Sequence, residues 1–352
     1  SDDQHAAPSK PKGKAGAGCK FPESGIEADF TLTKGCTVDV KSGVQVREGA
    51  TLTIEPGATV RFNGDGYLWV EEGRIVAKGT VKEPITFTST NKVPASGDFS
   101  GVHLNDKTMA GTVFEHVRFE YGGADKSGIH AALVLHENKG RVSVTDCVFS
   151  HNETAVHVDG GKVGFAKFER NTITDSKQSI DTVADAVGSL GAGNKFGAPL
   201  HVRGYVRESA TWPTLDQPVV VAENLEIGGE KSVATLTLAP KTVLKFNSGV
   251  YMAVGGGEGG SLVAKDVVFT SANPAPHAGD WIGLFIYEKA SNVTIDGCKI
   301  EYAGAEQSGG QAAVTFYSTS VKQKPTVKIA NTTFSSNNKA AIHSPDHECG
   351  DL

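Results

Sequence analysis

Apolar and polar residues alternate along much of the chain. In the stretch TLTIEPGATVRF (residues 51–62), Leu52 and Ile54 fall on one side and threonines on the other. This period of two is typical of a half-buried β-strand. Pro56-Gly57 is typical of a turn, because proline presets φ and glycine reaches positive φ without steric cost. The stretch therefore predicts two short strands joined by a turn.

The same pattern returns in the second half of the chain as TLTLAPKTVLKF (residues 235–246). Three further segments recur in the same order. They are FTST at 87–90 and FTSA at 269–272, GDFSGVHL at 97–104 and GDWIGLFI at 279–286, and RFEYGGADKSG at 118–128 and KIEYAGAEQSG at 299–309. The sequence therefore predicts two tandem copies of one unit.

A shorter repeat of strand and turn lies within each half. VTDCVFSHN from Val144 and VGFAKFERN from Val163 have apolar residues two positions apart and end in asparagine. A repeat of about twenty residues cannot bury its own apolar face, whereas stacked repeats can. This pattern predicts a solenoid of parallel strands.

Asparagines end several of these short repeats. Asn152, Asn171 and Asn337 hold the same place in their repeats. Asparagine tolerates the left-handed backbone conformation and can hydrogen-bond to the neighbouring coil. We expect them to form a stacked turn, and contact with a ligand is the alternative.

These segments together resemble the right-handed parallel β-helix repeat proteins of bacterial cell surfaces and secretions. The resemblance is carried by TLTIEPGATVRF, KGTVKEPITFTS, GDFSGV with GDWIGL, and FEYGG with IEYAG, and it extends over about residues 23–345. It implies an all-β fold, a right-handed parallel β-helix with two tandem duplicated units. The family includes polysaccharide lyases, glycosidases, adhesins and coat proteins, so the resemblance does not decide the activity.

The expected parts of the chain are a flexible N-terminal tether, two β-helix units and a short tail. They comprise residues 1–22, 23–187, 188–345 and 346–352. The tether is assigned because its Lys, Pro, Gly and Ala residues offer little surface to bury. Such a segment is typical of an exported protein or a bacterial lipoprotein, with a lipid anchor upstream of Ser1. We therefore expect a periplasmic, cell-surface or secreted protein.

Charge and hydropathy restrict the partners. The net charge of −6 argues against nucleic-acid binding, which needs a basic patch to neutralise phosphates. The chain has no run of eighteen apolar residues, so no transmembrane segment is expected. Polysaccharides and surface proteins remain as partners.

Five cysteines are present. Cys19 and Cys36 flank the start of the predicted solenoid, and we expect them to form a disulfide, which would favour an oxidising compartment. Cys147 and Cys298 fall in apolar strands and are expected to be buried free thiols. Cys349 has no assigned role.

Local catalytic signatures of related polysaccharide-cleaving enzymes are missing. The adjacent-aspartate motif of pectin hydrolases has no counterpart beyond Asp2-Asp3, and Trp281 does not begin the WxDH motif of pectate lyases. Asp98 and Asp280, in the matching GDFSG and GDWIG, are interpreted as turn residues. The enzyme hypothesis is weakened but stays open, because a site on a solenoid is assembled from different coils.

Histidines are concentrated in one part of the first unit. Six of the eleven lie between His103 and His157, and the matching positions of the second unit mostly hold other residues. If AALVLHE stacks beneath TAVHVDG, then His136 and His157 approach one another near Asp159. Such a group could bind zinc or act as an acid and a base. Solvated surface histidine is the alternative, and beyond calcium or zinc no cofactor is indicated.

Outward-facing aromatic residues are the other candidate for binding. In GYLWVEEG, Leu68 and Val70 should point inward, which leaves Tyr67 and Trp69 outside, and Tyr251 matches Tyr67 in the second unit. Aromatic faces on a sheet can stack on sugar rings, or they can pack under a loop. The expected function is a noncatalytic scaffold, or polysaccharide binding or adhesion. The alternative is a polysaccharide lyase or glycoside hydrolase with a site on an outer sheet of the first unit.

Overall fold

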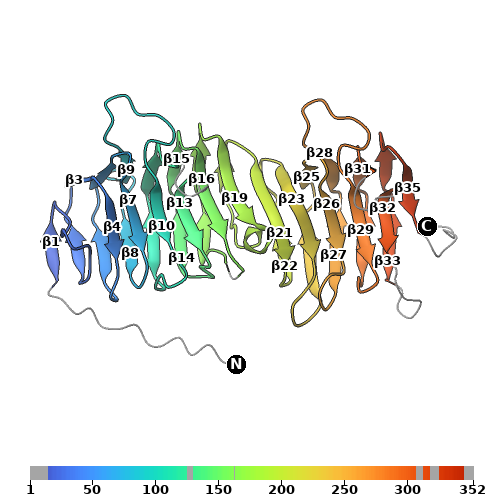
Figure 1. Ribbon diagram of the computed structural model, residues 1–352, viewed down its shortest axis with the longest axis horizontal. Coiled ribbons are helices and arrows are strands. Elements are labelled where there is room, and N and C mark those ends of the chain that lie inside the picture. Colours follow the sequence, from blue (N-terminus) through green and yellow to red (C-terminus); the bar gives the residue numbers. More distant parts are fainter. Residues whose placement is uncertain (1–14, 125–129, 162, 307–311, 318–324, 345–352) are drawn as a thin grey trace. The chain divides into compact units, whose positions relative to one another are not determined.

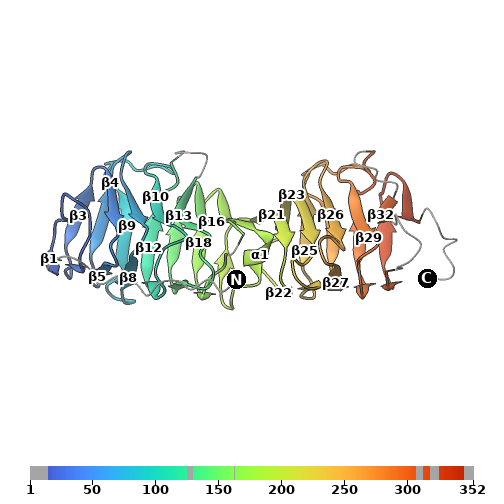
Figure 2. The same ribbon diagram turned by 60° about the horizontal axis from the view of Figure 1, so that its bottom comes forward.

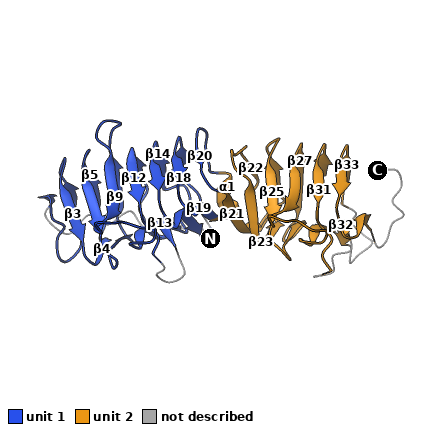
Figure 3. Ribbon diagram, turned by 90° about the horizontal axis from the view of Figure 1, so that it is seen from above, with its two compact units in different colours: residues 1–181, 189–198 blue, residues 182–188, 199–352 orange. Residues whose placement is uncertain are grey.

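The computed structural model describes residues 15–124, 130–161, 163–306, 312–317 and 325–344. The chain divides into two compact units (Figure 3). Unit 1 comprises residues 1–181 and 189–198, and unit 2 comprises residues 182–188 and 199–352. Residues 182–188 therefore belong to unit 2 and residues 189–198 to unit 1, whereas the sequence predicted one boundary between residues 187 and 188.

Three parallel sheets form unit 1, and their strands follow one another in every coil (Figure 1). The first contains β1 (Gly16–Gly18), β2 (Phe30–Leu32), β5 (Thr51–Ile54), β8 (Arg74–Lys78), β11 (Thr112–Glu115), β14 (Val142–Thr145) and β17 (Lys167–Glu169). The second contains β3 (Thr37–Val40), β6 (Thr59–Phe62), β9 (Ile85–Ser89), β12 (Val117–Glu120), β15 (Val148–Ser150), β18 (Thr172–Thr174) and β20 (Lys195–Phe196). The third, called here the front sheet of unit 1, contains β4 (Gly43–Val46), β7 (Tyr67–Val70), β10 (Gly101–Leu104), β13 (Ala131–His136), β16 (Thr154–Asp159) and β19 (Gln178–Val183).

Unit 2 repeats this arrangement of parallel strands. One sheet contains β22 (Ala210–Trp212), β24 (Ala234–Leu238), β27 (Gly260–Lys265), β30 (Val293–Asp296) and β33 (Val327–Ala330), and a second row contains β25 (Val243–Phe246), β28 (Val268–Ser271), β31 (Lys299–Glu301) and β34 (Thr333–Ser335). The front sheet of unit 2 contains β21 (Leu200–Val206), β23 (Val219–Ile227), β26 (Tyr251–Val254), β29 (Gly283–Tyr287), β32 (Ala312–Tyr317) and β35 (Ala340–His343). The short helix α1 (Ala184–Val187) lies beside β21 (Figure 2).

Alternating burial explains why the strands stack in register. In β5 and β6, Leu52, Ile54, Val60 and Phe62 are buried, while the residues between them face outward. Parallel pairing places Leu52 beside Phe30 on one side and Ile75 on the other. Apolar columns therefore run through the interior of the unit, and the predicted all-β parallel β-helix is confirmed.

The repeated turn keeps the same backbone conformation in both copies of the opening phrase. Gly57 has a φ of 75°, in the left-handed region where glycine is favoured. Lys241 holds the matching position and has a φ of 68°. The turn therefore keeps its backbone conformation in the second copy, although lysine takes the place of glycine there.

The asparagine turns differ in one respect from the expectation. The left-handed residues are those before each asparagine, namely His151, Arg170 and Ser336. The expectation that the asparagines themselves adopt this conformation is wrong. Their amides instead bind the preceding coil: Asn152 Oδ1 accepts from the Gly122 amide at 2.8 Å, and Asn152 Nδ2 donates to the Phe119 carbonyl at 2.9 Å. Asn171 and Asn337 each make the same pair of hydrogen bonds to the coil that precedes them.

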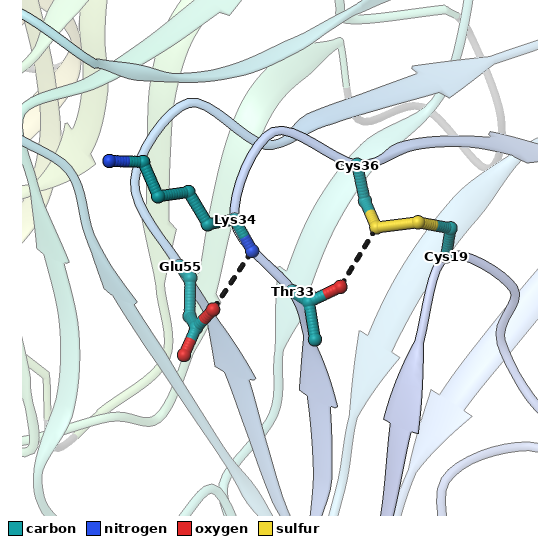
Figure 4. The surroundings of a disulfide bond; sticks show 5 residues. All are labelled: Cys19, Thr33, Lys34, Cys36 and Glu55. Atoms are coloured by element: carbon teal, nitrogen blue, oxygen red, sulfur yellow. Dashed lines mark hydrogen bonds between the residues drawn. A yellow bond between two sulfur atoms is a disulfide. The ribbon is translucent and has the colours of Figure 1, made fainter.

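A disulfide between Cys19 and Cys36 joins the beginning of unit 1 to its first complete coil (Figure 4). This confirms the predicted pair. The residues just before it, Gly16–Gly18, form β1 and pair with β2, so this end of the segment expected as a tether lies within a sheet. Cys147 and Cys298 are buried free thiols, as expected, and burial raises the pKa of Cys147 to about 12. Cys349 lies outside the described residues.

Candidate functional site

The front sheet of unit 1 presents a group of aromatic, imidazole and carboxylate side chains on its outer face. Leu68 and Val70 are buried, as predicted, whereas Tyr67 and Trp69 point outward and are partly exposed. The register places Trp69 beside His103 on the next strand. Because the strands are parallel and in register, these outward side chains form rows across successive coils.

Three rings lie close together on this face. The Trp69 ring centroid is 5.6 Å from that of His103 and 6.2 Å from that of His136. The two imidazoles are 6.3 Å apart and nearly parallel. We call Trp69, His103 and His136 the ring group. The exposed part of the Trp69 ring provides a surface of the kind on which a ligand ring can stack.

His103 is the most buried member of the ring group. Its Nε2 lies 3.1 Å from Ser100 Oγ, and its Nδ1 is buried without a hydrogen-bond partner in the part of the chain that the structure describes. Burial, with a smaller contribution from His136, lowers the pKa of His103 to about 4. His103 is therefore neutral at neutral pH. Its Nδ1 is covered by protein and unpaired within the described residues, and a buried polar atom without a partner is costly.

A network of histidines and aspartates continues the ring group across the next strands. His136 Nδ1 lies 2.7 Å from Asp159 Oδ1, and His157 Nε2 lies 3.4 Å from Asp159 Oδ2. His157 Nδ1 lies 2.9 Å from Asp181 Oδ2. The structure thus brings together His136, His157 and Asp159, the three residues that the sequence placed in one cluster, and adds Asp181. Sequence reasoning missed Asp181, although stacking QSIDTV beneath TAVHVDG would have found it.

The charges in this network balance one another. Burial works against a charged His157, but the hydrogen bonds that Asp159 and Asp181 accept from its ring nitrogens outweigh this effect and raise the pKa of His157. Burial likewise works against a charged Asp159, yet its hydrogen bonds with His136 and His157 hold the pKa of Asp159 well below the usual range. The charged forms of His157 and Asp159 therefore favour one another, and both ring nitrogens of His157 are occupied.

His136 is the residue of this network best placed to meet a ligand. Asp159 fixes the imidazole through Nδ1, and the side chain is 23 % exposed. Its Nε2 makes no hydrogen bond within the described residues, so it can bind a ligand group or exchange a proton with it. Among these residues there is also no group of three or more His, Cys, Asp or Glu side chains that could hold a metal ion.

The matched Gly-Asp motifs form turns. Asp98 Oδ2 accepts from the Ala95 amide, and Asp280 Oδ2 accepts from the His277 amide. The exits of the matching EYGG and EYAG segments are also turns, with left-handed Tyr121 and Tyr302. These residues shape the coil.

Unit 2 has different side chains at the corresponding positions of its front sheet. Tyr251, which matches Tyr67, donates from its hydroxyl to Glu226 Oε1 at 2.9 Å. Ala253 and Phe285 stand side by side where unit 1 has Trp69 and His103. The outer faces of the two units therefore offer different chemistry.

Residues 24–136 match the family model described as the pectate-lyase-like β-helix domain. The matched segment includes the whole ring group. This match and the stacked parallel strands together confirm the resemblance inferred from the sequence. The chain is a parallel β-helix repeat protein.

The other comparisons do not indicate a function for this parallel β-helix protein. No curated protein matches the chain. One solved structure, a mutant of the periplasmic alginate epimerase AlgG, aligns with 92 % of this chain and 80 % of its own, at 8 % sequence identity and a TM-score of 0.23. A similarity this weak supports no conclusion about function. Within the described residues, no helix is long and apolar enough to cross a membrane.

Proposed function

We propose that this β-helix protein is an exported, noncatalytic polysaccharide-binding protein, and that its ligand lies on the front sheet of unit 1. The ring group carries the proposal. Trp69 offers a partly exposed aromatic face beside His103, and His136 offers an oriented, partly exposed imidazole. Aromatic faces together with a few oriented polar groups are the features by which binding sites hold and orient small ligands.

Three further observations agree with this proposal. The matched family model is named for a polysaccharide-cleaving enzyme, which favours a polysaccharide as the ligand. The ring group and the histidine–aspartate network contain no Arg or Lys side chain. These groups therefore do not call for a strongly acidic ligand. The disulfide at Cys19 and Cys36 is consistent with export, since such bonds persist in oxidising compartments.

A polysaccharide lyase or glycoside hydrolase is the second candidate. It is favoured by the His136–Asp159 pair, because a carboxylate that orients an imidazole is a common acid–base arrangement. Cleavage also needs a second group that acts on the opposite side of the scissile bond. His157 is poorly suited to that role, since both of its ring nitrogens face carboxylates. Binding without cleavage is therefore the better-supported proposal.

One experiment tests both candidates. Acidic and neutral polysaccharides are incubated with the protein, with and without calcium or zinc. Retention of the protein in affinity gels measures binding, and size-exclusion profiles of the polysaccharides measure cleavage. We expect retention by at least one polysaccharide and no shortening of its chains. Shortened chains, lost in His136→Ala, would establish the enzyme instead.

The variants Trp69→Ala and His136→Ala assign the site. Truncation of an aromatic contact residue commonly costs more than ~1 kcal/mol, so we expect binding to weaken by about fivefold or more. His277→Ala is the matched control, because His277 is an exposed loop residue of unit 2. Unchanged binding in Trp69→Ala and His136→Ala would show that the ligand does not use the ring group.

A further inference from the structure

The front sheet of unit 2 contains a local irregularity between β21 and β23. Val202 pairs with Val221, and the next pair along the strands is Gly204 with Leu225. One residue of β21 therefore lies opposite three residues of β23, which bulge out of the sheet. The bulge is fixed from below, because Asn224 Oδ1 accepts from the Tyr251 amide and Asn247 Nδ2 donates to the Ala222 carbonyl.

A pocket of about 570 Å³ lies beside this bulge. Its walls include Tyr205, Tyr251, Glu223 and Glu226. Gly204 also lines the pocket, has a φ of 83°, and a Cβ added there would meet no atom within 4 Å. Gly204 therefore contributes no side chain that would fill this part of the pocket wall.

Two carboxylates line the pocket. Glu226 Oε1 accepts the Tyr251 hydroxyl, and Glu223 is exposed. Neither glutamate makes an ion pair within the described part of the chain. Burial and the neighbouring Glu226 carboxylate together raise the pKa of Tyr251, so its hydroxyl stays protonated and remains a donor.

A cation already rests on one wall of the pocket region. The Arg207 guanidinium lies 4.7 Å from the ring centroid of Tyr205. Arg207 is also paired with Asp185 at 2.7 Å and with Glu230 at 3.2 Å, so it does not neutralise the two pocket glutamates. Tyrosine faces and carboxylates are both suited to a cationic group, through cation–π attraction and charge-assisted hydrogen bonds.

Aromatic rings continue from the pocket across the front sheet of unit 2. The Tyr251 ring lies 5.2 Å from Phe285, and Phe285 lies 5.5 Å from Tyr317. Tyr317 lies 6.0 Å from Tyr287. These rings belong to the successive strands β26, β29 and β32, and they meet at tilted or edge-on angles. Phe285 is buried among them, so the accessible aromatic surface is that of Tyr251, Tyr287 and Tyr317.

We propose that this pocket binds the protonated amine of an amino sugar, within a deacetylated amino-sugar oligosaccharide whose neighbouring rings contact Tyr287 and Tyr317. The two glutamates pair with the ammonium group and the Tyr205 and Tyr251 rings enclose it. A saccharide is chosen over a basic peptide because partly exposed tyrosines continue from the pocket over three successive strands, and aromatic side chains of this kind can contact neighbouring sugar rings. This site is separate from the ring group of unit 1 and does not depend on polysaccharide binding there.

Isothermal titration calorimetry with chitosan oligosaccharide tests the proposal, and the fully N-acetylated chitin oligosaccharide is the comparison ligand. We expect chitosan oligosaccharide to bind and the N-acetylated form to bind about tenfold more weakly or not at all, because acetylation removes the charge. Glu226→Gln and Glu223→Gln should each weaken binding by about tenfold. Glu258→Gln, which removes an exposed charge of unit 2 outside the pocket, should leave it unchanged.

Circular dichroism confirms that each variant is folded. Glu223→Gln keeps the test decisive if Glu226→Gln misfolds, since Glu223 is exposed and its carboxylate makes no ion pair within the part of the chain that the structure describes. Equal binding of both oligosaccharides, or unchanged binding in the folded glutamine variants, would overturn the proposal. Oligolysine that binds as tightly and competes with chitosan would overturn the choice of a saccharide. Trp69→Ala, which tests unit 1, should have no effect on this binding.

Discussion

The buried asparagines show how a single side chain holds two coils together. Asn152 is fully buried and satisfies the amide of Gly122 and the carbonyl of Phe119 in the preceding coil. The sequence predicted a structural role from the shared position of these asparagines. It did not predict that the preceding residue takes the left-handed conformation, because both residues can adopt it and only the packed turn selects one.

Replacing Asn152 by alanine should therefore be costly. Asn152→Ala leaves a buried donor and a buried acceptor unpaired, and we expect the free energy of unfolding to fall by about 2–4 kcal/mol. Urea denaturation followed by circular dichroism measures this change. Asn91→Ala is the control, since Asn91 is exposed. A loss in Asn152→Ala no larger than in the control would contradict the role assigned to these bonds.

The histidines of the front sheet of unit 1 should respond to pH in opposite ways. Burial lowers the pKa of His103 to about 4, whereas Asp159 and Asp181 raise the pKa of His157 against the opposing effect of burial. In an NMR titration, the imidazole of His103 should stay neutral down to about pH 5, and that of His157 should remain protonated above the ordinary histidine value. Both imidazoles titrating together near pH 6.5 would contradict the network.

The same pKa shift makes a stability prediction. A raised pKa in the folded state stabilises the protein below the unfolded pKa of about 6.5, and this contribution disappears as the pH rises through the folded pKa. His157→Gln should therefore lower the free energy of unfolding by roughly 1.5–3 kcal/mol at about pH 5.5 and by less at about pH 9. Asp159, whose pKa is lowered, contributes above about pH 4 and ceases to do so as the pH falls. His277→Gln is the control and should show no such pH dependence.

The strands were predictable because alternation is local, whereas the irregular strand β23 was not. Its residues VVVAENLEI pair in turn with β25 and with β26. The polar residues between its two apolar parts form the bulge beside the pocket in unit 2. A sequence pattern does not show whether such residues form a turn or a bulge, because the difference depends on the pairing partners. The pocket could therefore be found only from the structure.

The loop before β10 contributes one aromatic side chain to the interior of unit 1. Figure 1 shows this loop, and the matching one before β29, extending beyond the strands of its own unit. Phe99 at the end of the first loop is buried and stacks on Phe62 at 4.5 Å. Trp281 takes the matching place in unit 2 and stacks on Phe246 at 4.1 Å. The GDFSG and GDWIG motifs thus return the chain to the core through an aromatic residue.

Truncating this aromatic anchor should destabilise the unit. Phe99→Ala removes a fully buried ring, and we expect a loss of about 3–5 kcal/mol in the free energy of unfolding. Denaturant unfolding measures the loss. Val93→Ala, in the same loop but 88 % exposed, should cost less than about 0.5 kcal/mol. Similar small losses in both variants would show that the loop does not contribute to the core.

For the protein as a whole, the first coil of unit 1 bears both on the stability of the fold and on the cellular compartment, because it contains the disulfide. A β-helix leaves an unpaired strand edge at its end, which is a site for aggregation unless it is covered. Here β1 pairs with β2, Phe21 packs edge-on against Phe30, and the Cys19–Cys36 disulfide holds the segment in place. The sequence located the disulfide, because both cysteines flank the first predicted strands, but it placed residues 16–18 in a tether since three small residues carry no apolar pattern.

Removing this disulfide should loosen the first coil. Closing a loop of 17 residues stabilises a folded chain by about 3 kcal/mol, so dithiothreitol should lower the free energy of unfolding by about that amount. The Cys19→Ser/Cys36→Ser double variant should be equally destabilised and insensitive to dithiothreitol, which separates this bond from any effect of reduction elsewhere. Before reduction, the denatured protein should show no more than three of its five thiols to a thiol reagent. Five reactive thiols would mean that the bond does not form, and would remove the main support for an oxidising compartment.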